Sequence, residues 1–147
     1  MSGRWRDQTT FVPRAGDDAG NCLQACVASL LGLPLEDVPN FAAVPEGGTD
    51  GKSHWFFAFE RWLRDRDLGV SVWYPTRGCD WYMAPESLAI ASGKSPRGDF
   101  QHSVVVRVTD GAEPELVHDP HPSRAGLAGP AKELWLLHRL DPVQVGP

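Results

Sequence analysis

The order of hydrophobic patterns along the chain constrains its fold more than any other feature of the sequence. The first half carries segments with the spacing and end signals of helices, whereas the final third carries β-branched runs separated by turn residues. Helices followed by strands, rather than alternating with them, are typical of an α+β protein. We therefore expect an α+β fold in which N-terminal helices pack on a C-terminal antiparallel sheet.

Two long helices are expected. Residues 22–31 are nearly all apolar or small, which predicts a buried helix that ends at Gly32. Residues 53–68 carry aromatic and leucine side chains at helical spacing, which predicts an amphipathic helix. Shorter helical segments are expected over 34–41 and 84–92.

Four segments have the composition of strands, with β-branched and aromatic residues between turn signals. They are 70–74, 103–108, 115–119 and 134–140. An Asp-Gly pair at 110–111 is a hairpin signal between the second and third of these segments. Those two strands should therefore pair antiparallel.

Composition fits one globular domain spanning residues 1–147 and excludes several function classes. Hydrophobic residues make up 41% of the chain and charged residues 22%, which is ordinary globular usage. A formal net charge of −5 without a basic run argues against nucleic-acid binding. The chain lacks an apolar stretch of transmembrane length and a signal-peptide pattern, so we expect no membrane partner and a cytoplasmic protein with free thiols.

Cys22 is the strongest candidate for chemistry. It stands at the expected start of helix 22–31, where the helix dipole and unpaired backbone N–H groups favour the thiolate. The alternative is a structural cysteine, because free cysteines are commonly buried. A nucleophilic role would require a partner that accepts the thiol proton.

His102 and Asp119 are candidates for that partner and its support. His102 begins one predicted strand and Asp119 ends the next. If the strands pair antiparallel, the two side chains lie side by side, and the carboxylate would fix the imidazole tautomer. The alternatives are an ordinary satisfied histidine and an Asp-Pro turn.

Three motifs in this order resemble the papain-like cysteine peptidase fold. They are Gly-Asn-Cys ending at Cys22, His-Ser-Val-Val-Val from His102, and His-Asp-Pro around Asp119. Within this fold, the sequence more closely resembles compact bacterial and phage members related to the peptidase domain that removes double-glycine leader peptides. The resemblance implies a Cys22 nucleophile, His102 as general base and then acid, and Asp119 as the residue that orients it.

The implied reaction is hydrolysis or acyl transfer at a peptide, amide or thioester bond through an acyl-enzyme intermediate, without a cofactor. The family also uses a side chain, usually glutamine, upstream of the nucleophile to stabilise the oxyanion. Gln8 is the glutamine upstream of Cys22, although farther away than the usual spacing, and Asn21 is the alternative. The partner would be a substrate with a peptide or amide bond.

Two other functions remain open at this stage. One is a non-catalytic papain-like module that binds a peptide or partner in the same cleft. The other is a zinc site, for which the ligands would be Cys22, Cys26, His118 and His121. Cys26 is otherwise expected in the core, and Cys79 in a loop.

Several further side chains could contribute to a binding groove. The aromatic candidates, for which edge packing is the alternative, are Trp73, Trp81 and Tyr82. Arg97 lies in a turn-rich loop and could bind a substrate carboxylate, with a solvated loop arginine as the alternative.

Overall fold

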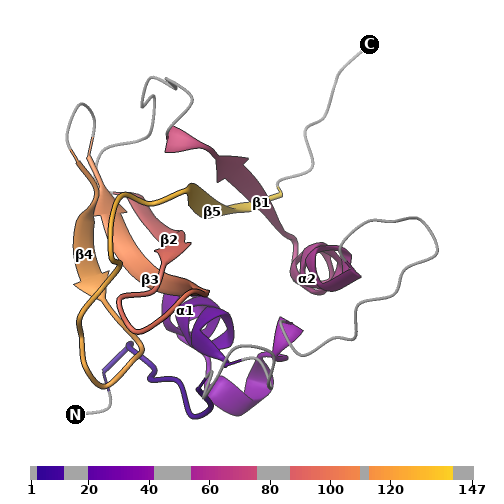
Figure 1. The fold of residues 1–147 in the computed structure, drawn as a ribbon. Coiled ribbons are helices and arrows are strands. Elements are labelled where there is room, and N and C mark those ends of the chain that lie inside the picture. The colour runs from indigo at the N-terminus through magenta and orange to yellow at the C-terminus, as the bar shows by residue number, and fades with distance from the viewer. Residues whose placement is uncertain (1–2, 12–19, 42–53, 76–86, 110–112, 141–147) are drawn as a thin grey trace.

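The protein has an α+β fold with one antiparallel sheet (Figure 1). The computed structural model describes residues 3–11, 20–41, 54–75, 87–109 and 113–140. The helices are α1 (Cys22–Leu31), the 3₁₀ turn η1 (Leu35–Asp37) and α2 (His54–Arg64). The strands are β1 (Leu68–Trp73), β2 (Ser87–Lys94), β3 (Gln101–Val108), β4 (Glu115–His118) and β5 (Glu133–Arg139). The order in the sheet is β1-β5-β2-β3-β4.

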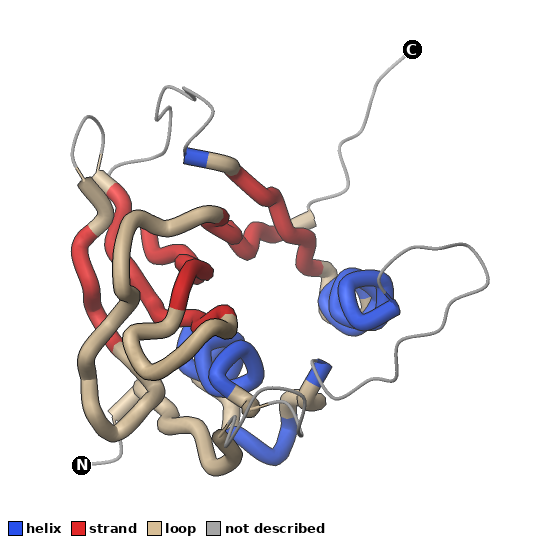
Figure 2. The backbone as a smooth tube through the Cα atoms, in the orientation of Figure 1, coloured by secondary structure: helices blue, strands red, loops and turns tan. Residues whose placement is uncertain are grey.

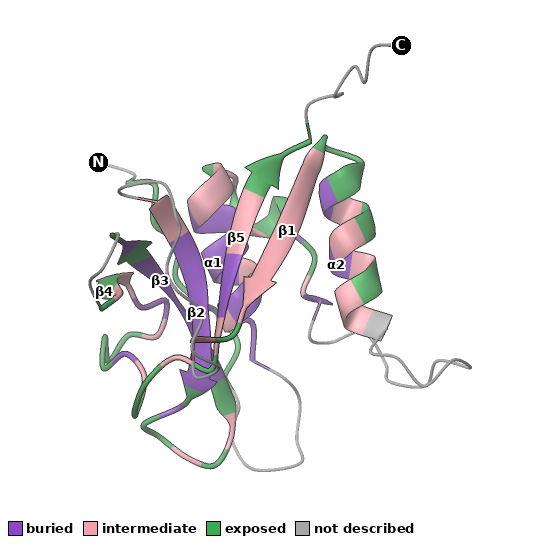
Figure 3. Cartoon of the chain, turned by 90° about the horizontal axis from the view of Figure 1, so that it is seen from above, coloured by how far each residue is buried: buried purple, intermediate pink, exposed green. Residues whose placement is uncertain are grey.

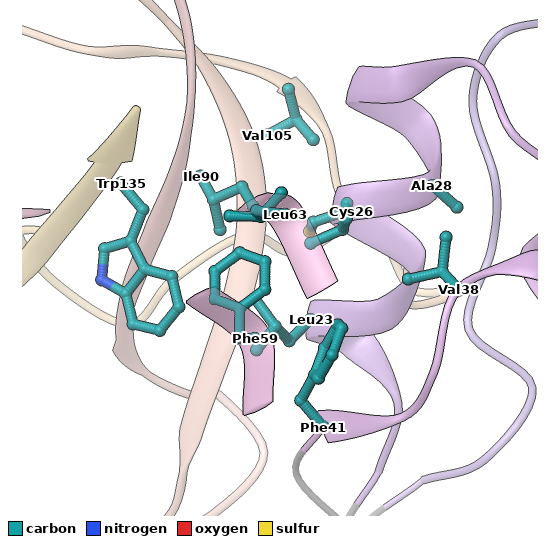
Figure 4. Close-up of a cluster of buried hydrophobic side chains, with 11 residues drawn as sticks. Leu23, Cys26, Ala28, Val38, Phe41, Phe59, Leu63, Ile90, Val105 and Trp135 are labelled. Carbon is teal, nitrogen blue, oxygen red and sulfur yellow. The ribbon is translucent and has the colours of Figure 1, made fainter. Parts of the chain in front are cut away.

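One face of the sheet packs against both α-helices. Side chains from α1, α2 and the strands β2, β3 and β5 form a single apolar cluster (Figure 4). Its fully buried members include Cys26, Val27, Phe59, Leu63, Ile90 and Val105. Trp135 of β5 stacks on Trp55 of α2 with ring centroids 5.4 Å apart. This cluster anchors α1, and therefore its first residue, against the sheet.

The opposite face of the sheet is covered by the loop between β4 and β5 (Figure 2). Leu127 and Ala131 of this loop pack on small side chains of β2 and β3. Gly93 permits this close approach, because a Cβ there would lie 3.2 Å from Leu127 and 3.3 Å from the Pro130 carbonyl oxygen. With both faces covered, β2 and β3 are buried along most of their length, whereas β1 is half-buried (Figure 3).

The predicted helix over 84–92 is wrong, because residues Ser87–Lys94 form strand β2. Alanine and leucine favour a helix locally, but β2 lies between β3 and β5 and forms hydrogen bonds with both. A strand buried on both faces does not show polar–apolar alternation, so the sequence carried no strand signal here. Tertiary pairing overrode the local preference.

The other elements lie close to their predicted positions. Helix α1 matches 22–31, and Gly32 ends it in the left-handed conformation with φ 68°. The helix expected over 53–68 ends earlier, at Arg64, and Leu68 begins β1. Among the described residues, no helix is long and apolar enough to cross a membrane.

Candidate functional site

The antiparallel pairing of β3 and β4 brings His102 and Asp119 together, as the sequence predicted. Val105 of β3 pairs with His118 of β4, so the start of one strand lies near the end of the other. The imidazole Nε2–H of His102 donates to Oδ1 of Asp119 at 2.7 Å, and both side chains are buried. A buried carboxylate therefore holds the imidazole in one orientation and one tautomer.

Asp119 is itself held by backbone groups. Besides His102, its Oδ1 accepts the N–H of His121 at 2.9 Å, and its Oδ2 accepts the N–H of Gly126 at 2.7 Å. Gly126 has φ 74°, a left-handed conformation that suits glycine. Burial alone would raise the pKa of Asp119, but the hydrogen bonds from His102, His121 and Gly126 outweigh it and lower that pKa.

His102 is neutral at physiological pH. Burial has the largest effect on the pKa of its imidazole and lowers it; the hydrogen bond to Asp119 and the charge of that carboxylate raise it, the positive charge of Arg97 lowers it, and the net result is a lowered pKa. Since Nε2 carries the proton donated to Asp119, Nδ1 keeps its lone pair. The ring is therefore equipped to accept a proton through Nδ1.

Cys22 is the first residue of α1 and is partly exposed. Hydrogen bonds from the backbone N–H and hydroxyl of Ser103, and from the backbone N–H groups of Cys22 and Leu23, act on its thiol. Because Ser103 directly follows His102, the sulfur lies beside the peptide bond that joins these two residues. The contact between the sulfur and the imidazole ring stays a prediction.

The charge state of Cys22 differs from the expectation drawn from the helix dipole. Burial raises the pKa of the thiol more than the hydrogen bonds from Ser103 and the helix start lower it. The resting site therefore contains a neutral thiol and a neutral imidazole rather than a thiolate–imidazolium pair.

Gln8 lies beside the residue that follows Asp119. Its backbone N–H donates to the Pro120 carbonyl oxygen at 3.1 Å, so the N-terminal segment does return to this region. Its side chain is buried, and the amide donates to the Thr10 carbonyl oxygen at 2.9 Å. The side-chain Oε1 of Gln8 is buried and has no hydrogen-bond partner among the described residues.

Asn21 has a different role from the helix cap that its position suggests. It occupies the N-cap position of α1, but its side chain makes no capping hydrogen bond. Instead Oδ1 accepts the backbone N–H groups of Thr9 and Thr10, and Nδ2 donates to Thr9 Oγ1 and Gln24 Oε1. Asn21 therefore holds the N-terminal segment through Thr9 and Thr10, while the hydrogen bond from Nδ2 to Gln24 ties its side chain to α1.

Arg124 is a residue that sequence analysis missed. Its guanidinium forms a bidentate pair with Asp7, at 2.6 and 2.9 Å, and also donates to the Asp119 carbonyl oxygen. The hydrogen bond from Arg124 is the main cause that lowers the pKa of Asp7. Arg124 thus joins the segment that carries Gln8 to the loop that carries Asp119. A local sequence pattern cannot predict this contact, because Asp7 and Arg124 are far apart in the sequence.

The remaining candidates lie as follows. Cys26 is fully buried in the core, as expected. Trp73 is in β1 and packs on the cluster beneath the β4–β5 loop. Within the described ranges, no group of three or more histidine, cysteine or acidic residues could hold a metal ion. Three candidates fall outside the described residues: Cys79, Trp81 and Tyr82.

Comparisons with family profiles, with curated proteins and with solved structures found no match to this chain.

Proposed function

We propose that this protein is a papain-like enzyme with a cysteine nucleophile, a hydrolase or acyltransferase that acts on a peptide, amide or thioester bond. The observation that carries the proposal is the buried His102–Asp119 pair, with the thiol of Cys22 beside the peptide that follows His102. The proposal includes a cytoplasmic location, where Cys22 and Cys26 would remain reduced.

The neutral charge states favour general-base activation of the thiol. In the proposed reaction, Nδ1 of His102 takes the thiol proton as the sulfur of Cys22 attacks the substrate carbonyl carbon. The carbon–sulfur bond forms, and the imidazolium, stabilised by Asp119, gives its proton to the leaving amine or thiol. The bond between the carbonyl carbon and the leaving group breaks, and the acyl group remains bound to the sulfur of Cys22 as a thioester.

The second half of the reaction releases the acyl group. His102 removes a proton from water or an acceptor amine as that nucleophile attacks the thioester carbonyl carbon. The carbon–sulfur bond then breaks, and the departing thiolate of Cys22 takes the proton from the imidazolium. The oxyanion of each tetrahedral intermediate would be stabilised by the backbone N–H of Cys22 and by the side-chain amide of Gln8. Asn21 supports this arrangement indirectly, because it holds the segment that carries Gln8.

Acylation by an activated ester probe, followed by intact mass, tests the proposal. The wild type and Cys26→Ala should gain one acyl group on Cys22, whereas Cys22→Ala should gain none. His102→Ala removes the proposed general base, so its acylation rate should fall by roughly 10²–10⁴-fold. Gln8→Ala should lose about 10²-fold, as expected for one of two oxyanion donors.

A binding module that uses the same cleft is the second candidate function. The raised pKa of the Cys22 thiol is also consistent with this function, because a neutral thiol without a functioning base reacts slowly. Iodoacetamide labelling separates the two functions. An enzyme should label quickly at Cys22, and His102→Ala should slow that labelling, whereas equally slow labelling of Cys22 in the wild type and in His102→Ala would favour the binding module.

A further inference from the structure

The turn between β2 and β3 forms an open hollow near the start of β3, the strand that carries His102. The hollow has a volume of about 470 Å³ and is lined by the residues from Lys94 to Asp99 together with Ala128. Its charged side chains are Lys94, Arg97 and Asp99, so two positive charges face one negative charge. A net positive hollow next to a nucleophilic site suits an anionic part of a substrate.

Arg97 connects this hollow to the candidate base. Its Nη1 donates to the Ser123 hydroxyl at 3.1 Å, and that hydroxyl lies 2.9 Å from Nδ1 of His121. The ring of His121 meets the ring of His102 edge-on, with the centroids 6.3 Å apart. The side chains of Arg97, Ser123 and His121 therefore form a continuous series of contacts from the hollow to the His102 imidazole.

The loop holds Arg97 so that its guanidinium remains available. The backbone N–H of Arg97 donates to the Ser95 hydroxyl, and the N–H of Ser95 donates to the Phe100 carbonyl oxygen, so the turn is fixed at both ends. Within the described ranges, Arg97 forms no ion pair with a carboxylate. Its side-chain hydrogen bond to Ser123 uses Nη1, so among the described residues donors remain for the forked geometry that carboxylates accept from arginine.

We propose that Arg97 binds a carboxylate of the substrate, so that the protein prefers substrates with a negative charge next to the bond that Cys22 attacks. This inference rests on the proposed function. The carboxylate could be the C-terminus of a short peptide or the side chain of an aspartate or glutamate.

Binding of such a carboxylate would also activate the base. Burial is the largest cause that lowers the pKa of His102 and of His121, and the positive charge of Arg97 lowers both further. A bound carboxylate neutralises that charge, so the pKa of His102 rises and its Nδ1 becomes a stronger proton acceptor only when the correct substrate is in place. Recognition and activation would then be linked through one guanidinium.

The experiment measures binding in the full-length Cys22→Ala variant, which cannot form a thioester, so its result does not depend on catalysis. Three probes are titrated at one ionic strength and followed by NMR: acetyl-Ala-Ala with a free carboxylate, its C-terminal amide, and acetyl-Ala-Glu amide. We expect at least one of the anionic probes to bind about 10- to 100-fold more tightly than the neutral probe. The tighter anionic probe identifies the source of the carboxylate.

Substitution of Arg97 then assigns the preference. Arg97→Gln should bring the anionic and neutral probes to equal affinity, whereas Arg107→Gln, which removes an exposed arginine near the other end of β3, should keep the difference. The inference is overturned by equal binding of all three probes, by the absence of binding, or by a preference that survives Arg97→Gln. Failure of acylation with intact binding would reject the proposed function and leave this site standing.

Discussion

Asp119→Asn tests how strongly the backbone around the candidate site depends on a carboxylate. Asp119 accepts three hydrogen bonds, two at Oδ1 from His102 and His121 and one at Oδ2 from Gly126. Asparagine keeps one acceptor oxygen and replaces the other with an NH₂ group. If the amide oxygen faces His102, the NH₂ group faces the N–H of Gly126, and two donors oppose each other.

The expected loss of stability follows from these contacts. A buried N–H without an acceptor costs about 1–3 kcal/mol. The two remaining hydrogen bonds lose the assistance of the negative charge, at about 1 kcal/mol each. Asp119→Asn should therefore lower the free energy of unfolding by about 3–5 kcal/mol, a large part of the roughly 5–15 kcal/mol that holds a domain folded.

Urea unfolding followed by tryptophan fluorescence measures this change, and an unchanged slope against urea shows that the unfolded state is comparable. Asp99→Asn is the matched control. It removes the same charge from an exposed position and should cost less than about 0.5 kcal/mol. A loss below about 1 kcal/mol in Asp119→Asn would refute the reasoning, because the three donors would then have found other acceptors.

Three further predictions concern the surroundings of the site. Gly126→Ala and Gly32→Ala each place a side chain at positive φ and should each cost about 1–2 kcal/mol in urea unfolding, but only Gly126→Ala should also slow acylation, since its N–H holds Asp119. Asn21→Ala should lower the free energy of unfolding by about 1–2 kcal/mol and slow acylation as well, because the N-terminal segment loses its acceptor; unchanged acylation would show that this segment has no part in the reaction. Acylation measured against pH should fall only below the ordinary histidine range, since the pKa of His102 is lowered and protonation removes the base; loss within or above that range would contradict general-base activation.

The sequence predicted those parts of the fold that local signals determine. Helix α1 carries its apolar run and its terminal glycine in consecutive residues, so both its bounds were predicted correctly. Strand β2 carries helix-forming residues, and only its two neighbours in the sheet make it a strand. Helix α2 ends before Asp67, which adopts the left-handed conformation with φ 57°. The chain leaves the helix here because Leu68 begins β1 and pairs with Arg139 of β5. Pairings of this kind depend on residues far along the chain, and no local pattern reveals them.

The same division applies to the candidate site. The proximity of His102 and Asp119 was predictable, because it follows from one hairpin between adjacent strands. The roles of Asn21 and Arg124 were not, since both depend on the path of the N-terminal segment, which has no periodic pattern. The raised pKa of Cys22 also required the structure, because desolvation depends on what covers the sulfur rather than on its position in a helix.

The position of β5 in the sheet has a consequence for how the chain folds. β5 is the last strand in sequence, yet it lies between β1 and β2 and pairs with both. During synthesis, β2 and β3 can pair before β5 is made. β1 cannot join the sheet until residues 133–139 leave the ribosome, because β5 is its partner strand, and α2 packs beside β1. Long-range pairing of this type slows folding, because the entropy of closing the intervening chain is lost before the contacts form. The sheet edge of β2 therefore stays open from the time residues 87–94 emerge until residues 133–139 follow, and an unpaired strand edge of this kind is open to pairing with another chain.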